Sequence, residues 1–441
     1  MTEKEYEGVP YEFDLVHSND DPRSNFIKSS VLEPHYPVAF SPSTNQPISY
    51  FLRGNEYWFD FSQHHVYMRG TIEGQSTEKD GEVFKSGETD PSFSIVNNFW
   101  HSLFSSCNVT INDTAVSMDT GNYPYIAYIQ DTINWSSDQF KTIGACSLFT
   151  EVDDNGKNKV KDAIISGANQ IAGVFKLKSP IFTRKKNIYN FMNVSITLNR
   201  VSNPEFYFKW DGAKAPQGYK FRIDEAVLYV RKQKVSEDYT QFLEGVLASG
   251  KFLRYYYKEC RIFTKTYTGF GTELIEEDFF HGIQPGFIIF GFVENTAFNG
   301  DKAKNPFHFS TVGNTIREVC IYVNGLPYPR PPLKMNFETK DTYDAYFALM
   351  SSFHGTENPD PPTITKADFD SGKSTLFAFN FAVDQNESSN ALSSFNHPAS
   401  LRLHVKFKQS SSNANYTLVV LYEMNSVLSF NKSRMVLYQS R

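Results

Sequence analysis

Many short segments of this sequence alternate apolar and polar residues at every second position. In NVSITLN, Val194, Ile196 and Leu198 alternate with polar residues, and LRLHVKFK (401–408) repeats the pattern near the C-terminus. This period matches a β-strand whose side chains point alternately to a buried and a solvent-exposed face. It favours an all-β protein built from antiparallel sheets. The segment FIIFGFV (287–293) lacks the alternation, which predicts a strand covered on both faces.

The alternating segments recur in the same order in the two halves of the chain. VTIND (109–113) matches IYVNG (321–325), whose Asn-Gly pair is a strong signal for a hairpin turn. The further matches, in chain order, are YIAYI (125–129) with YDAYF (343–347), GVFKLKSPIF (173–182) with TLFAFNFAVD (375–384), NVSITLN (193–199) with LRLHVKF (401–407), and AVLYVRK (226–232) with VVLYEMN (419–425). Each match alone is weak because strands resemble one another. The shared order predicts an internal duplication.

A chain of 441 residues exceeds what one hydrophobic core usually supports. It contains 40 Phe and 25 Tyr, residue types that favour strands. Two β-rich units of roughly 200 residues are too large for immunoglobulin-like sandwiches of about 100 residues, and they suit eight-stranded jelly rolls with long loops. The sequence therefore predicts an all-β fold of two tandem eight-stranded jelly rolls, a double jelly roll, with few short helices.

The domain boundaries follow from local composition. Residues 1–50 are polar and interrupted by proline, which predicts an N-terminal arm outside the core. The first jelly roll is expected over 51–235 and the second over 251–441. Between them, 236–250 begins with a serine suited to an N-cap, has apolar residues at helical spacing and ends with a glycine, which predicts a linker helix. Shorter helical turns are expected in NNFWHSLFSS and YIAYIQDTI.

Charge and cysteine content argue against several classes of protein. The formal net charge is −6, which gives no general electrostatic basis for binding nucleic acid, and the basic clusters at 184–186 and 231–234 are too short to follow a phosphate backbone. The cysteines are Cys107, Cys146, Cys260 and Cys320. They lack CxxC spacing, which argues against a zinc site and a disulfide framework and fits a reducing compartment. We expect no signal peptide and no membrane span.

The motifs that usually mark an active site are missing from the sequence. His64 and His65 are adjacent and would point to opposite faces of a strand, so they cannot chelate one ion together. HGTE (354–357) lies in a predicted loop, and GFG (269–271) lacks the remainder of a phosphate-binding loop. We assign no catalytic, metal-binding or cofactor-binding residues, and we expect no cofactor.

Neighbouring acidic residues occur at Glu276–Glu277 and Asp153–Asp154. Two carboxylates would support glycoside cleavage only if they faced each other across a cleft of about 5–10 Å. Adjacent acidic residues in a loop are more often simply solvated. The sequence therefore predicts that the protein is not an enzyme, and a long aromatic-rich sheet protein of this kind favours a binding or structural role exerted through contact area.

Several longer segments in both halves, taken in order along the chain, resemble segments of a known protein family. They are NNFWHSLFSSCNVTINDTAV (97–116), YPYIAYIQDTI (123–133) and DEAVLYVRK (224–232), followed by FGFVENTAFNGDKAKNPFHF (290–309), VCIYVNGLPYPRPPL (319–333), DAYFALM (344–350) and TLFAFNFAVD (375–384). In content and order these segments resemble the major capsid proteins of Maverick/Polinton elements and adintoviruses. The resemblance covers the chain from about residue 50 to the C-terminus.

The resemblance implies a hexon-like double jelly-roll major capsid protein. Three copies would form a pseudo-hexameric homotrimer, and trimers would tile an icosahedral shell around double-stranded DNA. The implied partners are copies of the chain itself, penton-like proteins and other minor capsid proteins, with no specific nucleic-acid binding. The implied location is the virion capsid, after synthesis in the host cytoplasm or nucleus without secretion.

Two other interpretations stay open at the level of sequence. One is a minor, penton-like capsid protein, which is usually a single jelly roll, so the duplication argues against it. The other is a carbohydrate-binding or glycan-cleaving β-sandwich protein, in which the aromatic run FYFKW (206–210) would stack on sugars. Packing of these aromatic residues onto the sheets is the competing explanation of the same run.

Overall fold

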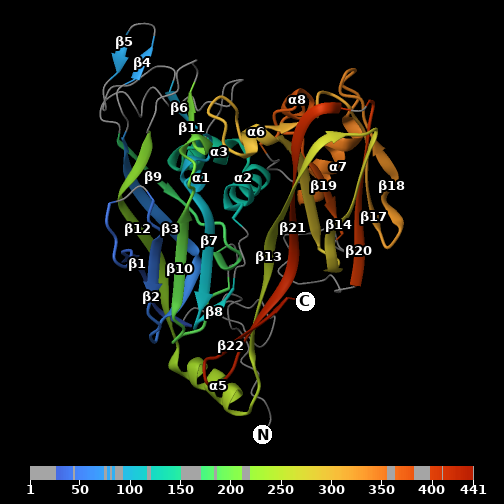
Figure 1. Ribbon diagram of the computed structural model, residues 1–441. Helices are drawn as coiled ribbons and strands as arrows, with labels where there is room; N and C mark the ends of the chain where they lie inside the picture. The colour runs from blue at the N-terminus through green and yellow to red at the C-terminus, as the bar shows by residue number, and fades with distance from the viewer. Residues whose placement is uncertain are drawn as a thin grey trace.

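Two β-sandwiches stand side by side, and helix α5 (Glu237–Ala248) lies below them (Figure 1). In this computed structural model the residues described are 26–42, 45–73, 77–79, 82–84, 93–116, 121–149, 170–182, 186–210, 219–354, 363–381, 398–409 and 411–440. No helix among them is both long and apolar enough to cross a membrane.

The first sandwich consists of two four-stranded antiparallel sheets. One sheet has the order β1 (Ile27–His35), β12 (Lys220–Val235), β3 (Trp58–Glu73), β9 (Gln170–Phe175). The other has the order β2 (Ile48–Leu52), β10 (Val194–Arg200), β7 (Phe104–Ile111), β8 (Thr114–Ala115). The connections of the first sandwich contain β4 (Thr77–Lys79) paired with β5 (Glu82–Phe84), and β6 (Phe93–Ile95) paired with β11 (Phe208–Trp210).

The second sandwich is built in the same way, with a few additional strands. One sheet has the order β13 (Leu253–Phe270), β21 (Ser411–Phe430), β15 (Phe287–Glu294), and β15 also pairs with β19 (Phe377–Asn380) and β16 (Phe309–Ser310). A last strand, β22 (Val436–Ser440), pairs with β21. The other sheet has the order β14 (Glu273–Ile283), β20 (Pro398–Phe407), β17 (Ile316–Val323), β18 (Leu326–Lys334).

The two sandwiches share one strand order. With the eight principal strands of each numbered along the chain, one sheet has the order 1-8-3-6 and the other 2-7-4-5 in both sandwiches. The eight are β1, β2, β3, β7, β8, β9, β10 and β12 in the first sandwich, and β13, β14, β15, β17, β18, β19, β20 and β21 in the second. This order confirms the predicted fold class of two tandem eight-stranded jelly rolls.

The strands follow the alternation of the sequence. Val194, Ile196 and Leu198 of β10 are fully buried, whereas the residues between them are half-buried. β20 shows the same alternation of burial. β15 is the predicted exception, since it is buried from Phe287 through Val293 and lies between paired strands on both sides. At Gly291 a Cβ atom would come within 2.6 Å of the Phe309 ring, so the close packing over β15 requires glycine there.

The helices lie in the connections between strands. They are α1 (Phe99–Ser102), α2 (Tyr123–Asn134), α3 (Ser137–Ser147), α6 (Asn295–Phe298), α7 (Tyr343–His354) and α8 (Lys366–Ser371), with 3-10 turns η1 (Pro180–Phe182) and η2 (Pro204–Phe206). The helix predicted between the domains is α5, which connects the last strand of the first sandwich to the first strand of the second. It ends at Ala248, two residues before the predicted glycine, Gly250, whose φ of +84 suits glycine.

The structure corrects the predicted N-terminal arm. Within 1–50, residues Ile27–His35 form β1, which pairs with β12 over its whole length, and β2 begins at Ile48. The first sandwich therefore starts before residue 51. The sequence did not reveal β1 because this strand lies at the edge of its sheet and its residues are exposed or half-buried, so no apolar alternation is required.

Candidate assembly surfaces

An aromatic layer joins the two sandwiches. The ring of Tyr128 on α2 stacks on Phe307 of the second sandwich, with centroids 4.3 Å apart and planes inclined by 3°. Tyr125, one helical turn earlier, stacks on Phe298 at 5.1 Å and meets Phe307 edge-on at 5.4 Å. Phe307 is fully buried. Stacked and edge-to-face aromatic pairs of this kind contribute beyond the area they bury, so this layer forms the apolar centre of the joint.

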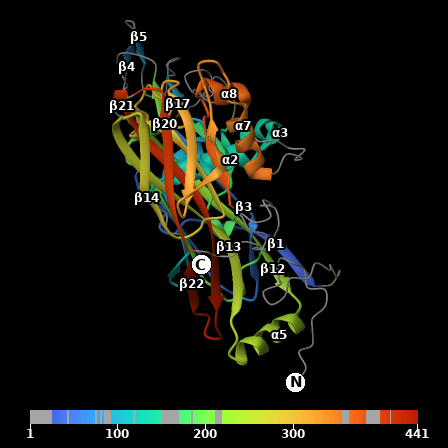
Figure 2. The ribbon, with the colours of Figure 1, turned by 90° about the vertical axis from the view of Figure 1, so that its right-hand side faces the viewer.

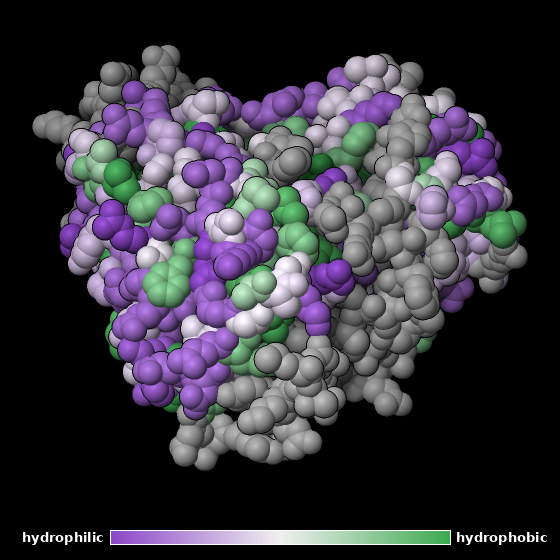
Figure 3. Space-filling view, turned by 90° about the horizontal axis from the view of Figure 1, so that it is seen from below, coloured by the Kyte–Doolittle hydropathy of each residue, from purple (hydrophilic) through white to green (hydrophobic). Residues whose placement is uncertain are grey.

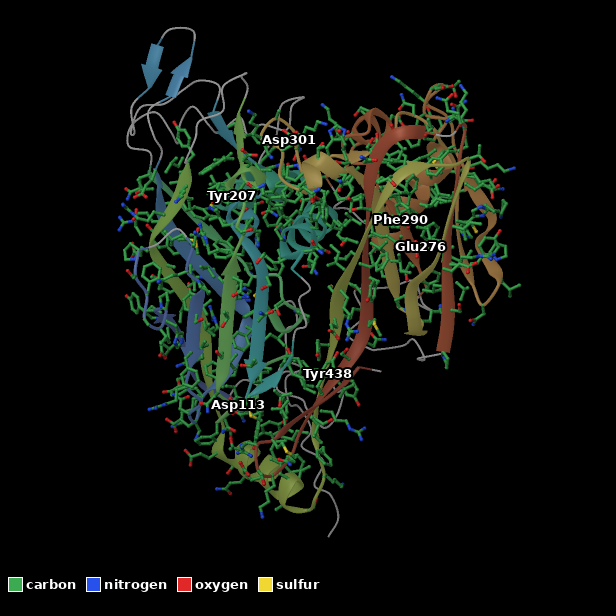
Figure 4. The ribbon with its side chains drawn as sticks, in the orientation of Figure 1. Asp113, Tyr207, Glu276, Phe290, Asp301 and Tyr438 are labelled. Atoms are coloured by element: carbon green, nitrogen blue, oxygen red, sulfur yellow. The ribbon has the colours of Figure 1, made fainter. Side chains whose placement is uncertain are left out.

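A buried lysine lies beside the aromatic layer. The Lys209 ammonium donates to the backbone carbonyl of Asp301 in the second sandwich at 2.8 Å and to that of Glu205 at 2.9 Å. Lys209 is 3% exposed, and burial lowers its pKa to about 7. Nearby, the Asn203 amide donates to the carbonyl of Asn299 at 3.0 Å. Figure 4 labels Asp301 at this upper part of the joint.

A second joint lies lower down, where α5 meets the turn between β21 and β22. The guanidinium of Arg434 pairs with the Glu244 carboxylate of α5 and covers the Tyr189 ring at 4.5 Å. The Tyr189 hydroxyl donates to the same carboxylate at 3.0 Å. Arg434 and Tyr189 hold the pKa of Glu244 below its usual value although partial burial opposes this. The two sandwiches are thus attached to each other at both ends of their shared face.

The turn between β7 and β8 also touches the second sandwich. The Asn112 amide donates to the carbonyl of Arg434 at 2.8 Å, and the Thr114 hydroxyl donates to the carbonyl of Val436 at 3.1 Å. Figure 4 labels Asp113, the residue between Asn112 and Thr114 in this turn, in the lower part of the molecule. The matched segment at 109–113 therefore leads into a turn that makes an interdomain contact.

A buried carboxylate anchors the C-terminal strand to its sheet. Glu259 of β13 is 2% exposed and accepts hydrogen bonds from Ser426 at 3.0 Å and from the Tyr438 hydroxyl of β22 at 2.5 Å. The Arg261 guanidinium binds the same carboxylate through two nitrogens, at 2.9 and 3.1 Å. Because every partner is part of the same sheet, this cluster has a structural role.

A second buried polar cluster lies between α2 and the first sandwich. Asp131 is fully buried, and its carboxylate lies 2.5 Å from the Lys178 ammonium. Burial raises the pKa of Asp131, although Lys178 opposes the shift, and burial lowers the pKa of the adjacent His101 well below its usual value. His101 bonds the Tyr123 hydroxyl at 2.9 Å. Full burial keeps this acid and this histidine away from any substrate in solution, so the cluster fixes α2 in place.

The residues singled out in the sequence do not come together. His64 is buried and accepts a hydrogen bond from the Leu177 amide at 2.8 Å, whereas His65 stacks on Tyr229. Burial lowers the pKa of His64 to about 3, so its ring is neutral. Among the described residues, no group of three His, Cys, Asp or Glu side chains could hold a metal ion.

The two adjacent glutamates on β14 differ in orientation, one side chain pointing inward and the other outward. Glu276 is 3% exposed, accepts from Lys265 at 2.6 Å and also bonds the Tyr267 hydroxyl. Glu277 points outward near Arg402, at 3.7 Å. These carboxylates do not face each other across a cleft. Asp153–Asp154 and most of HGTE lie outside the described residues, and in GFG Gly269 and Phe270 end β13 while Gly271 is an exposed residue directly after it.

A surface pocket of about 230 Å³ opens beside the end of β15. Its lining includes Glu294, Lys304, His308 and Tyr416, and Glu294 is paired with Lys304. The lining contains one carboxylate, whereas glycoside cleavage ordinarily uses two. The pocket therefore lacks the usual acid pair of a glycosidase.

The aromatic run at 206–210 packs inward. Phe206, Tyr207 and Phe208 are 7%, 3% and 5% exposed. Phe208 and Tyr207 lie against Phe99 of α1, and Phe206 lies against Phe307 across the joint. These three rings are therefore not available to stack on sugars. The four cysteines are all free, with Cys107 and Cys320 buried and Cys146 exposed.

The joint residues were not predicted from the sequence. Lys209 lies between Phe208 and Trp210 in FYFKW, and a cation inside an aromatic run was the available signal of a buried, hydrogen-bonded lysine. In the coloured part of the face seen from below in Figure 3, most residues are hydrophilic and the apolar residues lie in separate patches.

No protein-family model matches this sequence, and no curated protein matches it. Solved structures do match, over nearly the whole length of both chains. A chain of the Sputnik virophage structure superposes with a TM-score of 0.64 at 9% identity, covering 98% of this chain and 92% of the other. The fold is the double jelly roll. The PBCV-1 virus capsid matches with a TM-score of 0.60 at 10% identity and coverages of 96% and 99%. The Faustovirus major capsid protein matches with 0.57 at 10% identity and coverages of 94% and 92%.

At these identities the likeness establishes the fold of both sandwiches together. The matched structures cover the chain from the first sandwich to the second, so the whole double jelly roll is shared and not one sandwich alone. The named neighbours are components of virus particles.

Proposed function

We propose that this chain is a hexon-like major capsid protein. Three copies would form a pseudo-hexameric homotrimer, and trimers would tile an icosahedral shell around double-stranded DNA. The observation that carries the proposal is the presence of two sandwiches with one strand order, fixed side by side in a single chain. Three such chains present six similar lobes, which is the outline that a sixfold lattice position requires.

The joint between the sandwiches supports this function. The aromatic layer around Phe307, the buried Lys209 and the Arg434–Glu244 pair attach the sandwiches at separate points along their shared face. A capsomer needs such stiffness because each lobe must meet its neighbours at a fixed angle. The likeness to capsid proteins over nearly the full length of both chains supports the same proposal.

The finer identity rests on the sequence segments that resemble Maverick/Polinton and adintovirus major capsid proteins. On this proposal the partners are copies of the chain, penton-like proteins and other minor capsid proteins, and the protein is located in the virion capsid. Synthesis would take place in the host cytoplasm or nucleus. The net charge of −6 fits a shell protein without specific nucleic-acid binding. The protein would act without catalysis and without a cofactor.

Expression of the full chain, followed by measurement of its mass in solution and electron microscopy, tests the proposal. We expect particles of three times the 50.4 kDa chain mass, and larger shells or sheets built from them. A protein that stays monomeric at micromolar concentration would contradict the capsid function, because obligate interfaces of this kind bury well over about 2,000 Å².

A further inference from the structure

Helix α7 of the second sandwich is the counterpart of α2, and its outer face is uncovered. Both helices follow the fifth strand of their sandwich, and they carry the related motifs YIAYI and YDAYF. On α2, Tyr125 and Ile129 are 2% and 0% exposed, and Tyr125 lies against Phe298 and Phe307 of the second sandwich. Their counterparts on α7, Tyr343 and Phe347, are 70% and 60% exposed.

A turn at the other end of the sandwich shows the same difference between covered and uncovered counterparts. In the first sandwich the turn between β7 and β8 contacts the second sandwich through Thr114 and Val436. In the second sandwich the corresponding turn joins β17 to β18, and the residue that corresponds to Thr114 is Leu326. Leu326 is 59% exposed. Three large apolar side chains thus lie uncovered on α7 and this turn, where the first sandwich makes its contacts to the second.

The first strands of the two sandwiches, β13 and β1, also differ in whether they are covered. β13, the first strand of the second sandwich, is covered by the first sandwich, and Tyr255 and Tyr257 are fully buried. Their hydroxyls donate to the carbonyls of Lys186 at 3.1 Å and Val116 at 3.4 Å. The counterpart of β13 is β1. Its large apolar residues and those that follow it are exposed: Ile27 40%, Val31 51%, Leu32 44%, Tyr36 69% and Val38 59%.

We propose that α7 of one copy docks on β1 and residues 36–38 of a second copy, and that the β17–β18 turn of the first copy lies near the start of that β1, as the β7–β8 turn lies near the start of β13 within one chain. The proposal rests on the proposed trimer and names the faces that form it. Within one chain, α2 meets β13, where Gln130 donates to the Cys260 sulfur at 3.0 Å. Between copies, α7 would meet the strand that corresponds to β13, which is β1. The contact already made inside the chain is then repeated between chains.

The pairing registers locate the contact on β1. Cys260 of β13 pairs with Glu423 of β21, which corresponds to Val230 of β12 when the shared Val-Leu-Tyr segments are aligned. Val230 pairs with Glu33 of β1. Helix α7 of the neighbouring copy would therefore lie near Glu33, next to the exposed Tyr36 and Val38.

The positions of the two faces allow a closed ring. In Figure 1, β1 lies at the left edge of the first sandwich and α7 lies in the second sandwich, with β17 and β18 to its right, and in Figure 2 both lie toward the same side of the molecule. A contact between two different faces is heterologous, and it produces a ring when the rotation between copies closes. Because both contact faces are inclined toward the same side of the molecule, each copy is rotated in the same direction relative to the copy before it. Six sandwiches would then alternate between contacts within a chain and contacts between chains.

The substitution Phe347→Asp tests the face on α7. We expect it to raise the dissociation constant of the trimer roughly 30-fold or more, as for an apolar residue at the centre of an interface, measured by light scattering after size-exclusion chromatography. The matched control is Ile275→Asp on β14, since Ile275 is 49% exposed. Phe51 on β2, the corresponding strand of the first sandwich, stays 50% exposed although the sandwiches are packed together. The control residue therefore lies outside the repeated contact, and it should leave the trimer unchanged.

Crosslinking tests the pairing of the two faces directly. In a Cys146→Ser background, which removes the exposed thiol, Phe347→Cys combined with Val38→Cys should be linked between copies by a short bismaleimide. Bands at two and three chain masses on a denaturing gel are the expected result. Ile275→Cys combined with Val38→Cys should give only the single-chain band.

The outcomes separate this inference from the proposed function. If the unmodified chain is a monomer, the trimer itself is contradicted. If the unmodified chain is a trimer but Phe347→Asp has no more effect than Ile275→Asp, the assignment of the faces is overturned while the capsid function stands. A trimer that crosslinks equally well through Ile275 and Phe347 would overturn it as well.

Discussion

The substitution Phe307→Ala examines whether the two sandwiches form one rigid unit. Phe307 is fully buried, and three of its ring partners belong to the first sandwich: Tyr128 at 4.3 Å, Tyr125 at 5.4 Å and Phe206 at 6.0 Å. Replacing a buried Phe by Ala costs about 3–5 kcal/mol, and each lost aromatic pair accounts for about 0.5–1.5 kcal/mol of interaction beyond area burial. Because these partners lie across the joint, we expect a loss of about 4 kcal/mol that falls mainly on the attachment of α2 to the second sandwich.

Hydrogen exchange followed by mass spectrometry measures this loss where it occurs. In Phe307→Ala the amides of α2 should exchange faster by about two to three orders of magnitude, since each 1.4 kcal/mol corresponds to about tenfold. The matched control is Phe369→Ala, since Phe369 is equally buried but its ring partners Phe337, Tyr346 and Phe377 all belong to the second sandwich. The control should lower the stability of the second sandwich and leave α2 protected. Unchanged protection of α2 in Phe307→Ala would refute the idea that the aromatic layer holds the sandwiches together.

Two further predictions concern the buried charged groups. Burial lowers the pKa of Lys209 to about 7, so between this value and the usual 10.5 the folded chain binds fewer protons than the unfolded chain, and the free energy of unfolding rises with pH. In Lys209→Met the free energy of unfolding, measured with urea between about pH 7 and 9, should rise less steeply with pH, by up to about 1.4 kcal/mol per pH unit. A slope identical to that of the unmodified chain would argue against a buried, titrating Lys209. Glu259→Gln removes the charge partner of Arg261 and weakens the anchor of β22, so we expect a loss of about 3–5 kcal/mol and faster proteolysis near the C-terminus. Glu277→Gln, whose side chain is 69% exposed, should stay within about 0.5 kcal/mol, and equal losses in both variants would contradict the structural role of Glu259.

The regular parts of the fold could be predicted from the sequence because one face of each strand is buried. The alternation in β10 and β20, the unbroken apolar run of β15 and the helix α5 between the halves each follow from burial. β1 was missed for the opposite reason. As an exposed edge strand it buries little, so its composition resembled that of a loop.

The contacts of the joint could not be predicted from the sequence because they join residues far apart in the chain. Lys209 is held by the backbone carbonyl of Asp301, and a carbonyl leaves no trace in the sequence. The aromatic layer brings α2 against residues 298–309, whereas in the sequence both were visible only as aromatic segments. The duplication did indicate which segments correspond, and this correspondence distinguishes the covered face of α2 from the uncovered face of α7.

Single-particle electron cryomicroscopy of the purified full-length chain measures the arrangement of copies most directly. We predict a closed ring of three chains in which six sandwiches alternate, with α7 of each chain seated on β1 of the next. A particle with a single chain, or a two-fold dimer joined through other faces, would contradict the account.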